Sequence, residues 1–146
     1  MPIDDTSKTI IVDCDGVIAD KSHGGQYHLA EPLTYGIEQV NKLYDMGYDI
    51  TLYTARYGDR EKGSIHLQYE RGYREWTDWL KKHGVKYTHA FMGKPGGIMY
   101  IDDKAARVEG DSQVGWDQVW REVDNLHGRD RYGNKISGTA YISGTP

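Results

Sequence analysis

The sequence predicts an α/β fold in which helices flank a mainly parallel sheet. The first observation is the continuous apolar run Ile10-Ile11-Val12, which is typical of a strand buried on both faces of a parallel sheet. The second is that strand and helix patterns alternate along the chain, because this alternation indicates βαβ units with helices packed on the sheet. The 146 residues suffice for one domain with a real core, and we expect that domain to span residues 1–127.

The first predicted strand covers residues 8–12, and a loop over 21–33 leads to the first predicted helix. This helix is indicated by apolar residues at helical spacing, namely Ile37, Val40 and Tyr44. Thr34 is its predicted N-cap, and Gly47 is the glycine predicted to end it.

Residues 49–54 form the second predicted strand, and a long polar loop is expected over 55–71. The second helix ends at Gly84 and is marked by residues expected on one face, namely Trp76, Trp79, Leu80 and His83. Its tryptophan pair is expected in the core rather than in a binding site.

The last part of the domain is predicted to hold two short strands and a third helix. The strands are expected at 87–92 and 98–101, and the apolar stripe of the helix consists of Trp116, Val119, Trp120 and Val123. The predicted order is therefore β-α-β-α-β-β-α.

Composition and charge exclude some classes of function. A net charge of −4 and a pI near 5.8 give no overall positive field, so broad electrostatic binding of nucleic acid is not indicated. The single cysteine, Cys14, excludes an internal disulfide. No stretch resembles a signal segment or reaches the ~20 apolar residues of a membrane span, so we expect a cytoplasmic protein. Residues 128–146, rich in Gly, Ser and Thr, are predicted to form a polar tail.

Functional side chains follow three of the predicted strands directly. An Asp-Cys-Asp-Gly sequence at 13–16 follows the first strand, Thr-Ala-Arg at 54–56 follows the second, and an acidic pair at 102–103 follows the strand at 98–101. Ligands of open parallel sheets bind beyond the carboxyl ends of the strands. We therefore expect these residues to gather around one crevice.

The carboxylates at these strand ends predict a metal site. Four carboxylates brought together repel one another strongly unless a cation is present. Mg²⁺, which takes one or two carboxylates together with water and phosphate oxygens, suits Asp13 and Asp102 better than a thiolate-bound metal does. Cys14 is expected to point into the core.

With these motifs assembled, the sequence resembles the haloacid dehalogenase-like (HAD) superfamily. Its first motif, a strand followed by Asp-x-Asp-Gly, matches residues 13–16, its second matches 52–54, and its fourth, an acidic pair after a strand, matches 100–103. The third motif is a lysine, for which Lys94 in Gly-Lys-Pro is the best match; the other candidates are Lys81, Lys82 and Lys86.

Within the superfamily, residues 9–107 resemble the small capless phosphatases associated with capsule biosynthesis. This resemblance implies a three-layer Rossmann-like fold without a large cap domain. It also implies a Mg²⁺-dependent phosphomonoester hydrolase acting on a small phosphorylated metabolite such as a sugar phosphate or nucleotide.

The resemblance further implies a role for each carboxylate. Asp13 would attack phosphorus to give an aspartyl-phosphate, and Asp15 would protonate the leaving oxygen and then deprotonate water. Mg²⁺ would be held by Asp13, by the backbone carbonyl of Asp15 and by Asp102, with Asp103 acting through a metal-bound water.

Other residues would bind the phosphate. By the same resemblance, the Thr54 hydroxyl and the amides near Gly16 and Ala55 would hold its oxygens, and Lys94 would offset its charge. Arg56, two residues beyond Thr54, is expected to point into the same crevice and contact substrate.

One feature departs from the superfamily pattern. A parallel crossover normally takes ~10 or more residues, and fewer than that separate Met92 from Ile98. Either the strand ending at Met92 is very short or its direction differs, and the placement of Lys94 depends on which is true.

Substrate selection must come from loops, because no segment is long enough for a separate cap domain. The candidate selectors are His23, Tyr27, His28, Arg56, Tyr57, Arg60 and His66. Two alternatives remain open: a nucleic-acid end phosphatase, since residues 56–71 are locally basic, and a HAD-like binding module without catalysis.

Overall fold

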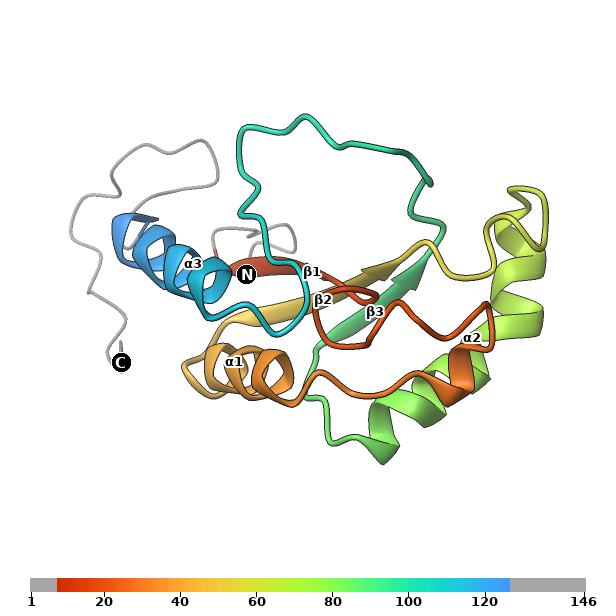
Figure 1. Cartoon of the computed structure of the whole chain (residues 1–146), viewed down its shortest axis with the longest axis horizontal. Helices are drawn as coiled ribbons and strands as arrows, with labels where there is room; N and C mark the ends of the chain where they lie inside the picture. Colours follow the sequence, from red (N-terminus) through yellow and green to blue (C-terminus); the bar gives the residue numbers. More distant parts are fainter. Residues whose placement is uncertain (1–7, 127–146) are drawn as a thin grey trace, which may run out of the picture.

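The computed structural model describes residues 8–126, which form three strands, three α-helices and one short 3₁₀ helix. The elements are β1 (Thr9–Asp13), η1 (Tyr27–Leu29), α1 (Thr34–Asp45), β2 (Asp49–Thr54), α2 (Ile65–Lys82), β3 (His89–Met92) and α3 (Gln113–Leu126). Figure 1 shows the strands side by side with α1 and α2 along the sheet. The predicted tail at 128–146 lies outside the described residues.

The three strands form one parallel sheet in the order β1-β2-β3. In its register Asp13 pairs with Tyr53, and Thr54 pairs with Met92. The carboxyl ends of all three strands therefore meet at one edge. The predicted α/β fold, with a parallel sheet flanked by helices, is confirmed, and no cap domain is present among residues 8–126.

The core lies on one face of the sheet. Alternate residues of the strands point to this face, and the buried ones are Val12, Ile50, Leu52, Ala90 and Met92. Helix α1 contacts β2 and helix α2 contacts β3. On the opposite face Ile11 is 66% exposed and Phe91 47% exposed. The expectation that the first strand is buried on both faces is therefore wrong at Ile11, because the described residues place no layer over it.

Helix α1 begins where the sequence predicts, but a distant residue caps it. Leu33 occupies the N-cap position without a side-chain hydrogen bond, so the prediction of Thr34 as N-cap is wrong. Instead the Gly36 amide in the first turn donates to the Asp111 carboxylate at 3.1 Å. A carboxylate suits this end of a helix, where free N–H groups and the helix dipole favour negative charge. This contact joins the segment before α3 to α1.

Helix α2 begins earlier than predicted, so the polar loop ends at Ser64 rather than at residue 71. The Ser64 hydroxyl accepts a hydrogen bond from the Leu67 amide at 3.3 Å, which is N-cap geometry. Trp76 and Trp79 are buried, as expected for core residues. No helix in the described part of the chain is long and apolar enough to cross a bilayer.

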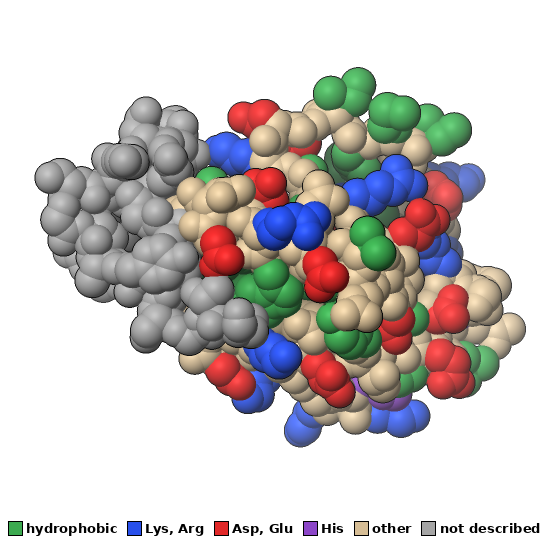
Figure 2. All heavy atoms as spheres, turned by 60° about the vertical axis from the view of Figure 1, so that its left-hand side comes forward, with side chains coloured by type: hydrophobic (Ala, Val, Ile, Leu, Met, Phe, Trp, Pro, Cys, Tyr) green, Lys and Arg blue, Asp and Glu red, His purple; other side chains and the backbone are tan. Residues whose placement is uncertain are grey.

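Residues 98–101 do not form the predicted fourth strand. They belong to a loop between β3 and α3 that arcs away from the sheet, and every residue from 95 to 105 is exposed. Ile98, Met99 and Ile101 are among the most exposed hydrophobic side chains, and hydrophobic side chains stand out along the top of Figure 2. The short connection after Met92 gives the chain too little length for a parallel crossover, which is the physical reason for the error.

Candidate active site

The candidate site lies at the carboxyl edge of the sheet, where residues from all three strand ends meet. Asp13 is the last residue of β1, and Thr54 is the last residue of β2. The Lys94 amide donates to the Thr54 carbonyl at 3.1 Å, which holds the residues after β3 beside β2. The parallel topology alone thus brings these three positions together.

Asp13 is a carboxylate that is partly open to solvent and engaged by one cation. Its Oδ1 accepts from the Cys14 amide at 2.8 Å, and its Oδ2 lies 3.4 Å from Lys94 Nζ. The Asp13 side chain is 38% exposed and that of Lys94 18%. Burial raises the pKa of Asp13 above its ordinary value, although Lys94 and the Cys14 amide act to lower it. The result is an accessible carboxylate with an ammonium group beside it.

Asp15 is held by two basic side chains. Arg56 Nε donates to Asp15 Oδ2 at 3.0 Å and Arg56 Nη2 donates to Oδ1 at 2.8 Å, which is a bidentate pair. His23 Nε2 lies 3.2 Å from Oδ1 of the same carboxylate. Asp15 is therefore fixed in orientation, with both of its oxygens occupied.

Arg56 is enclosed rather than directed at a substrate. Its side chain is 1% exposed, and its guanidinium lies over the rings of Tyr27 and Trp79 at 5.1 and 5.5 Å. Burial acts to lower the pKa of Arg56, but its hydrogen bonds to the negatively charged Asp15 outweigh this and raise it. The expectation that Arg56 contacts substrate directly is not met in this structure, where it supports Asp15.

Two of the predicted phosphate-binding groups are engaged inside the protein. Thr54 is fully buried, and its hydroxyl accepts from the Arg56 amide at 3.1 Å. The Gly16 amide donates to the Ala19 carbonyl at 2.7 Å, and Gly16 has a positive φ of 90° that suits glycine in the tight turn. Ala55 is only partly buried. In this structure Thr54 and Gly16 therefore contribute to the site through hydrogen bonds within the protein.

Cys14 takes no part in the chemistry of this edge. The thiol is fully buried, as the sequence analysis expects, and accepts a hydrogen bond from Trp76 Nε1 at 3.4 Å. Burial raises the pKa of Cys14 to about 12, so the thiol is protonated and a poor nucleophile at neutral pH.

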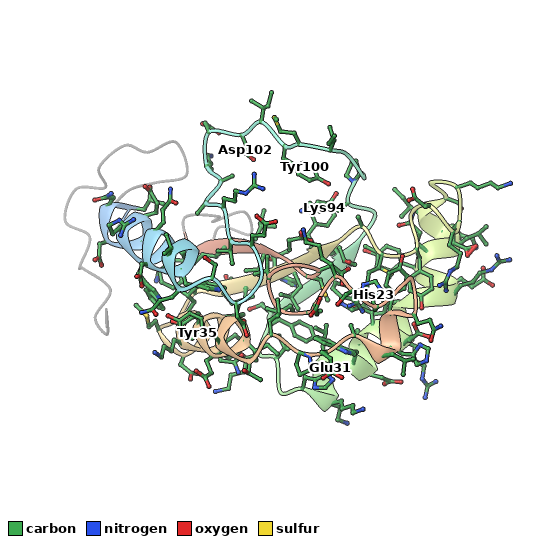
Figure 3. All side chains as sticks on the ribbon, viewed as in Figure 1. His23, Glu31, Tyr35, Lys94, Tyr100 and Asp102 are labelled. Atoms are coloured by element: carbon green, nitrogen blue, oxygen red, sulfur yellow. The ribbon has the colours of Figure 1, made fainter. Side chains whose placement is uncertain are left out.

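The acidic pair predicted to complete a metal site lies apart from the other carboxylates. Asp102 and Asp103 are exposed on the arcing loop, where Asp102 Oδ1 accepts from the Lys104 amide at 2.8 Å. Figure 3 shows Asp102 near the top of this loop, while Lys94 lies close to the strand ends. No group of three potential ligand residues is found among residues 8–126. In the described conformation these residues do not fit a magnesium ion.

The structure adds groups that the sequence analysis did not assign to these roles. Lys21 lies across the Asp-x-Asp-Gly turn, since a Cβ built on Gly16 would lie 2.6 Å from its Cε. His23, which the sequence predicts as a substrate selector, contacts Asp15. Neither residue belongs to a periodic pattern in the sequence. The one sequence signal for both is their place in the loop that follows β1, close to the Asp-x-Asp-Gly turn.

Other predicted selectors are spread around this site. His28 faces Glu75 on α2, with Nδ1 and Oε2 3.9 Å apart, and lines a surface pocket of about 430 Å³. His66 lies on α2 next to Glu70 and is strongly exposed. Arg60 stacks on Tyr57, its guanidinium carbon 4.5 Å from the ring centroid. None of these three contacts Asp13 or Asp15.

The fold and the site define a class of protein: α/β proteins that carry a polar, carboxylate-containing site at the carboxyl edge of an open parallel sheet. No model of a protein family matches the sequence, and a comparison with curated proteins finds no match.

Among solved structures, the chain is similar to a protein from Vibrio cholerae. The two share 34% sequence identity and a TM-score of 0.63, and the alignment covers 68% of this chain and 83% of that protein. The chain belongs to the same family as this Vibrio cholerae protein. A more distant likeness, at 21% identity and a TM-score of 0.41, is to D,D-heptose 1,7-bisphosphate phosphatase from B. bronchiseptica, determined with magnesium and phosphate; it covers 84% of this chain and 67% of that one.

Proposed function

We propose that the chain is a HAD-type phosphatase that hydrolyses the phosphomonoester of a small metabolite, such as a sugar phosphate or nucleotide, through an aspartyl-phosphate on Asp13. The observation that carries this proposal is the pairing of an accessible Asp13 with Lys94, beside a second carboxylate that Arg56 holds in place. The order of motifs along the sequence supports the same reaction.

In the proposed reaction, one oxygen of Asp13 forms a bond to phosphorus while the bond from phosphorus to the substrate oxygen breaks. Two negative groups must approach each other in this step, and the Lys94 ammonium 3.4 Å from Asp13 Oδ2 offsets their repulsion. Water then attacks phosphorus, and inorganic phosphate leaves as Asp13 is regenerated.

Asp15 is the acid–base group of the proposal. As the carboxylate bound to Arg56 and His23, it is ready to take a proton from the attacking water. Protonation of the leaving oxygen in the first step requires the acid form of Asp15, so we expect its hydrogen bonds to Arg56 and His23 to loosen when substrate binds.

The charges of the site favour a cation that arrives with substrate. Two carboxylates, Asp13 and Asp15, are accompanied by Lys94, Arg56 and the nearby Lys21, so a phosphate dianion would leave the site with a net charge of about −1. Bound Mg²⁺ would supply this missing positive charge. Its proposed ligands remain Asp13, the backbone carbonyl of Asp15 and Asp102, with Asp103 acting through a metal-bound water. Asp102 and Asp103 would reach the metal only if the arcing loop approached β1.

The contacts of the arginines support a small substrate over a nucleic-acid end. Arg56 is bound to Asp15, Arg60 stacks on Tyr57, and Arg71 Nη1 lies 2.7 Å from Glu61 Oε1. The locally basic segment 56–71 therefore does not form a groove of free positive charges, which binding of single-stranded nucleic acid would need.

Release of inorganic phosphate from para-nitrophenyl phosphate, with and without Mg²⁺, tests the proposal. We expect metal-dependent turnover by the wild type and by Asp117→Asn, an exposed carboxylate on α3, and at least a ~10³-fold lower rate for Asp13→Asn. Equal rates for Asp13→Asn and the wild type would contradict the assignment of the nucleophile. Phosphate binding without turnover would favour the non-catalytic binding module.

A further inference from the structure

The loop after β2 contains a large side chain in an unfavourable backbone conformation. Tyr57 has a φ of 68°, in the left-handed region that an aromatic residue rarely adopts. Such a conformation is unfavourable and persists only where surrounding contacts impose it, often at functional sites. Tyr57 immediately follows Arg56, which holds Asp15.

Three contacts hold Tyr57 in this conformation. Its ring fills a notch at Gly72 of α2, where an added Cβ would lie 2.4 Å from Tyr57 Cδ2 and 2.6 Å from Cε2. Its hydroxyl donates to Glu75 one turn further along α2, and its amide donates to the Tyr27 hydroxyl at 3.3 Å. Burial and Glu75 raise the pKa of Tyr57 to about 12, so the hydroxyl keeps its proton. Ring, hydroxyl and backbone are thus all anchored.

The consequence of this anchoring falls on Arg56. The Gly58 amide donates to the Ala55 carbonyl at 3.0 Å, closing a turn with Arg56 and Tyr57 at its centre. With the ring of Tyr57 seated on α2, the Arg56 side chain leaves the turn on the side of Asp15 and is covered by Tyr27 and Trp79. If the ring left its notch, the turn could relax to an ordinary negative φ at residue 57, and this would redirect residue 56.

We propose that Tyr57 is a positioning residue whose left-handed backbone, locked by Gly72 and Glu75 of α2, aims Arg56 at Asp15. The contact with Asp15 follows from the geometry, and its value for catalysis rests on the proposed function of Asp15. Two residues of α2, acting through the ring and the hydroxyl of Tyr57, thereby control the orientation of the acid–base group.

The first test measures the Arg56–Asp15 contact without any assay of activity. A buried guanidinium that donates to a carboxylate gives a slowly exchanging Nε–H signal in a ¹H–¹⁵N spectrum of the full chain, identified by its loss in Arg56→Lys. We expect Gly72→Ala, whose new methyl group displaces the Tyr57 ring, to abolish or broaden this signal. The matched control on the same helix, Thr77→Ala, should leave it unchanged. An unchanged signal in folded Gly72→Ala would overturn the proposal.

The second test measures the effect on catalysis in a double-mutant cycle. Gly72→Ala should lower kcat ~10- to 100-fold with less than a ~3-fold change in KM, because Asp15 is misoriented while Asp13 and Lys94 are untouched. In a Tyr57→Gly background, which has no ring to displace, Gly72→Ala should change kcat less than ~2-fold further. Equal effects of Gly72→Ala in the two backgrounds would overturn the coupling.

One result would separate this inference from the proposed function. If the wild type releases no phosphate but Gly72→Ala loses the Arg56 signal, the positioning role stands and the proposed reaction fails.

If Gly72→Ala does not fold, Tyr57→Phe carries the test, since it removes only the hydroxyl that donates to Glu75. It should accelerate exchange of the Arg56 Nε–H, and an unaltered exchange rate would contradict the role of Glu75.

Discussion

Arg56 carries a buried positive charge, and the carboxylate paired with it is that of Asp15. Removing Arg56 leaves the Asp15 carboxylate with only His23 as a partner among residues 8–126, and breaking such a pair costs more than the pair itself contributes. We expect Arg56→Met to lower the free energy of unfolding by about 2–4 kcal/mol, towards the lower value because Asp15 is 24% exposed. Urea denaturation of both proteins measures this difference. A loss below about 1 kcal/mol would show that solvent replaces the guanidinium at Asp15.

Cys14 gives a direct chemical test of the core. With its pKa raised to about 12 by burial, the thiol should not react with an aromatic disulfide reagent at pH 8 while the protein is folded. The expected result is one equivalent of reactive thiol in denaturant and almost none in buffer. Rapid labelling of the native protein would mean that the turn after β1 is open.

The charged form of Asp13 should destabilise the protein, because burial raises the pKa of this carboxyl above its ordinary value. When a carboxyl group binds its proton more tightly in the folded state, the protein loses stability as pH rises from the ordinary pKa of the group through its pKa in the folded state. Asp13→Asn should therefore have a higher Tm than the wild type at pH 7, and the difference should shrink toward pH 4. A Tm difference that grows on acidification would show the opposite sign of the shift.

At the scale of single elements, the N-cap of helix α2 should make a measurable contribution to the stability of the protein. Ser64→Ala should cost about 1 kcal/mol of unfolding free energy, since its hydroxyl caps the Leu67 amide. Ser22→Ala serves as a control, because Ser22 lies in an exposed loop where its hydroxyl donates to Asp20 at 2.8 Å. Equal, negligible effects in thermal denaturation would place the beginning of the helix further along the chain.

Most elements could be predicted from apolar spacing, because α1, α2 and α3 each present a stripe of core residues. The first turns of α2 could not, since Ile65 is 56% exposed and polar residues dominate the sequence around it. The run at 98–101 was predicted as a strand because four apolar residues in sequence look alike in a strand and in a loop. Only the length of the connection after Met92 indicated otherwise.

At the scale of the whole molecule, parallel topology made part of the site predictable. Residues that directly follow parallel strands must share one edge, which is why Asp13 and Lys94 lie close enough to contact each other. The contact of Arg56 with Asp15 joins residues 41 positions apart. It depends on the left-handed backbone of Tyr57, which no local sequence pattern indicates. The position of Asp102 depends on the path of a loop, which residue spacing does not determine.

The proposed metal ligands on that loop predict a specific dependence on magnesium. If the loop brings Asp102 to Asp13 during the reaction, Asp102→Asn should raise the Mg²⁺ concentration needed for half-maximal activity ~10- to 100-fold. Glu109→Gln, an exposed carboxylate near the end of the same connection, should leave it unchanged. A magnesium titration of phosphate release measures both. Identical titrations for the wild type and Asp102→Asn would remove Asp102 from the proposed ligand set.

The exposed loop between β3 and α3 also divides the chain in a useful place. Tyr100 is 53% exposed within an unbroken run of exposed residues, so a chymotrypsin-like protease should cut there first. The amino-terminal piece would keep Asp13, Asp15, Arg56 and Lys94, while the other piece would carry Asp102 together with α3. Because Trp120 of α3 donates to Gln39 of α1 at 2.9 Å, the two pieces have a surface through which to reassociate. The protein is thus a natural candidate for fragment complementation, with the proposed nucleophile Asp13 in one piece and Asp102, one of the proposed metal ligands, in the other.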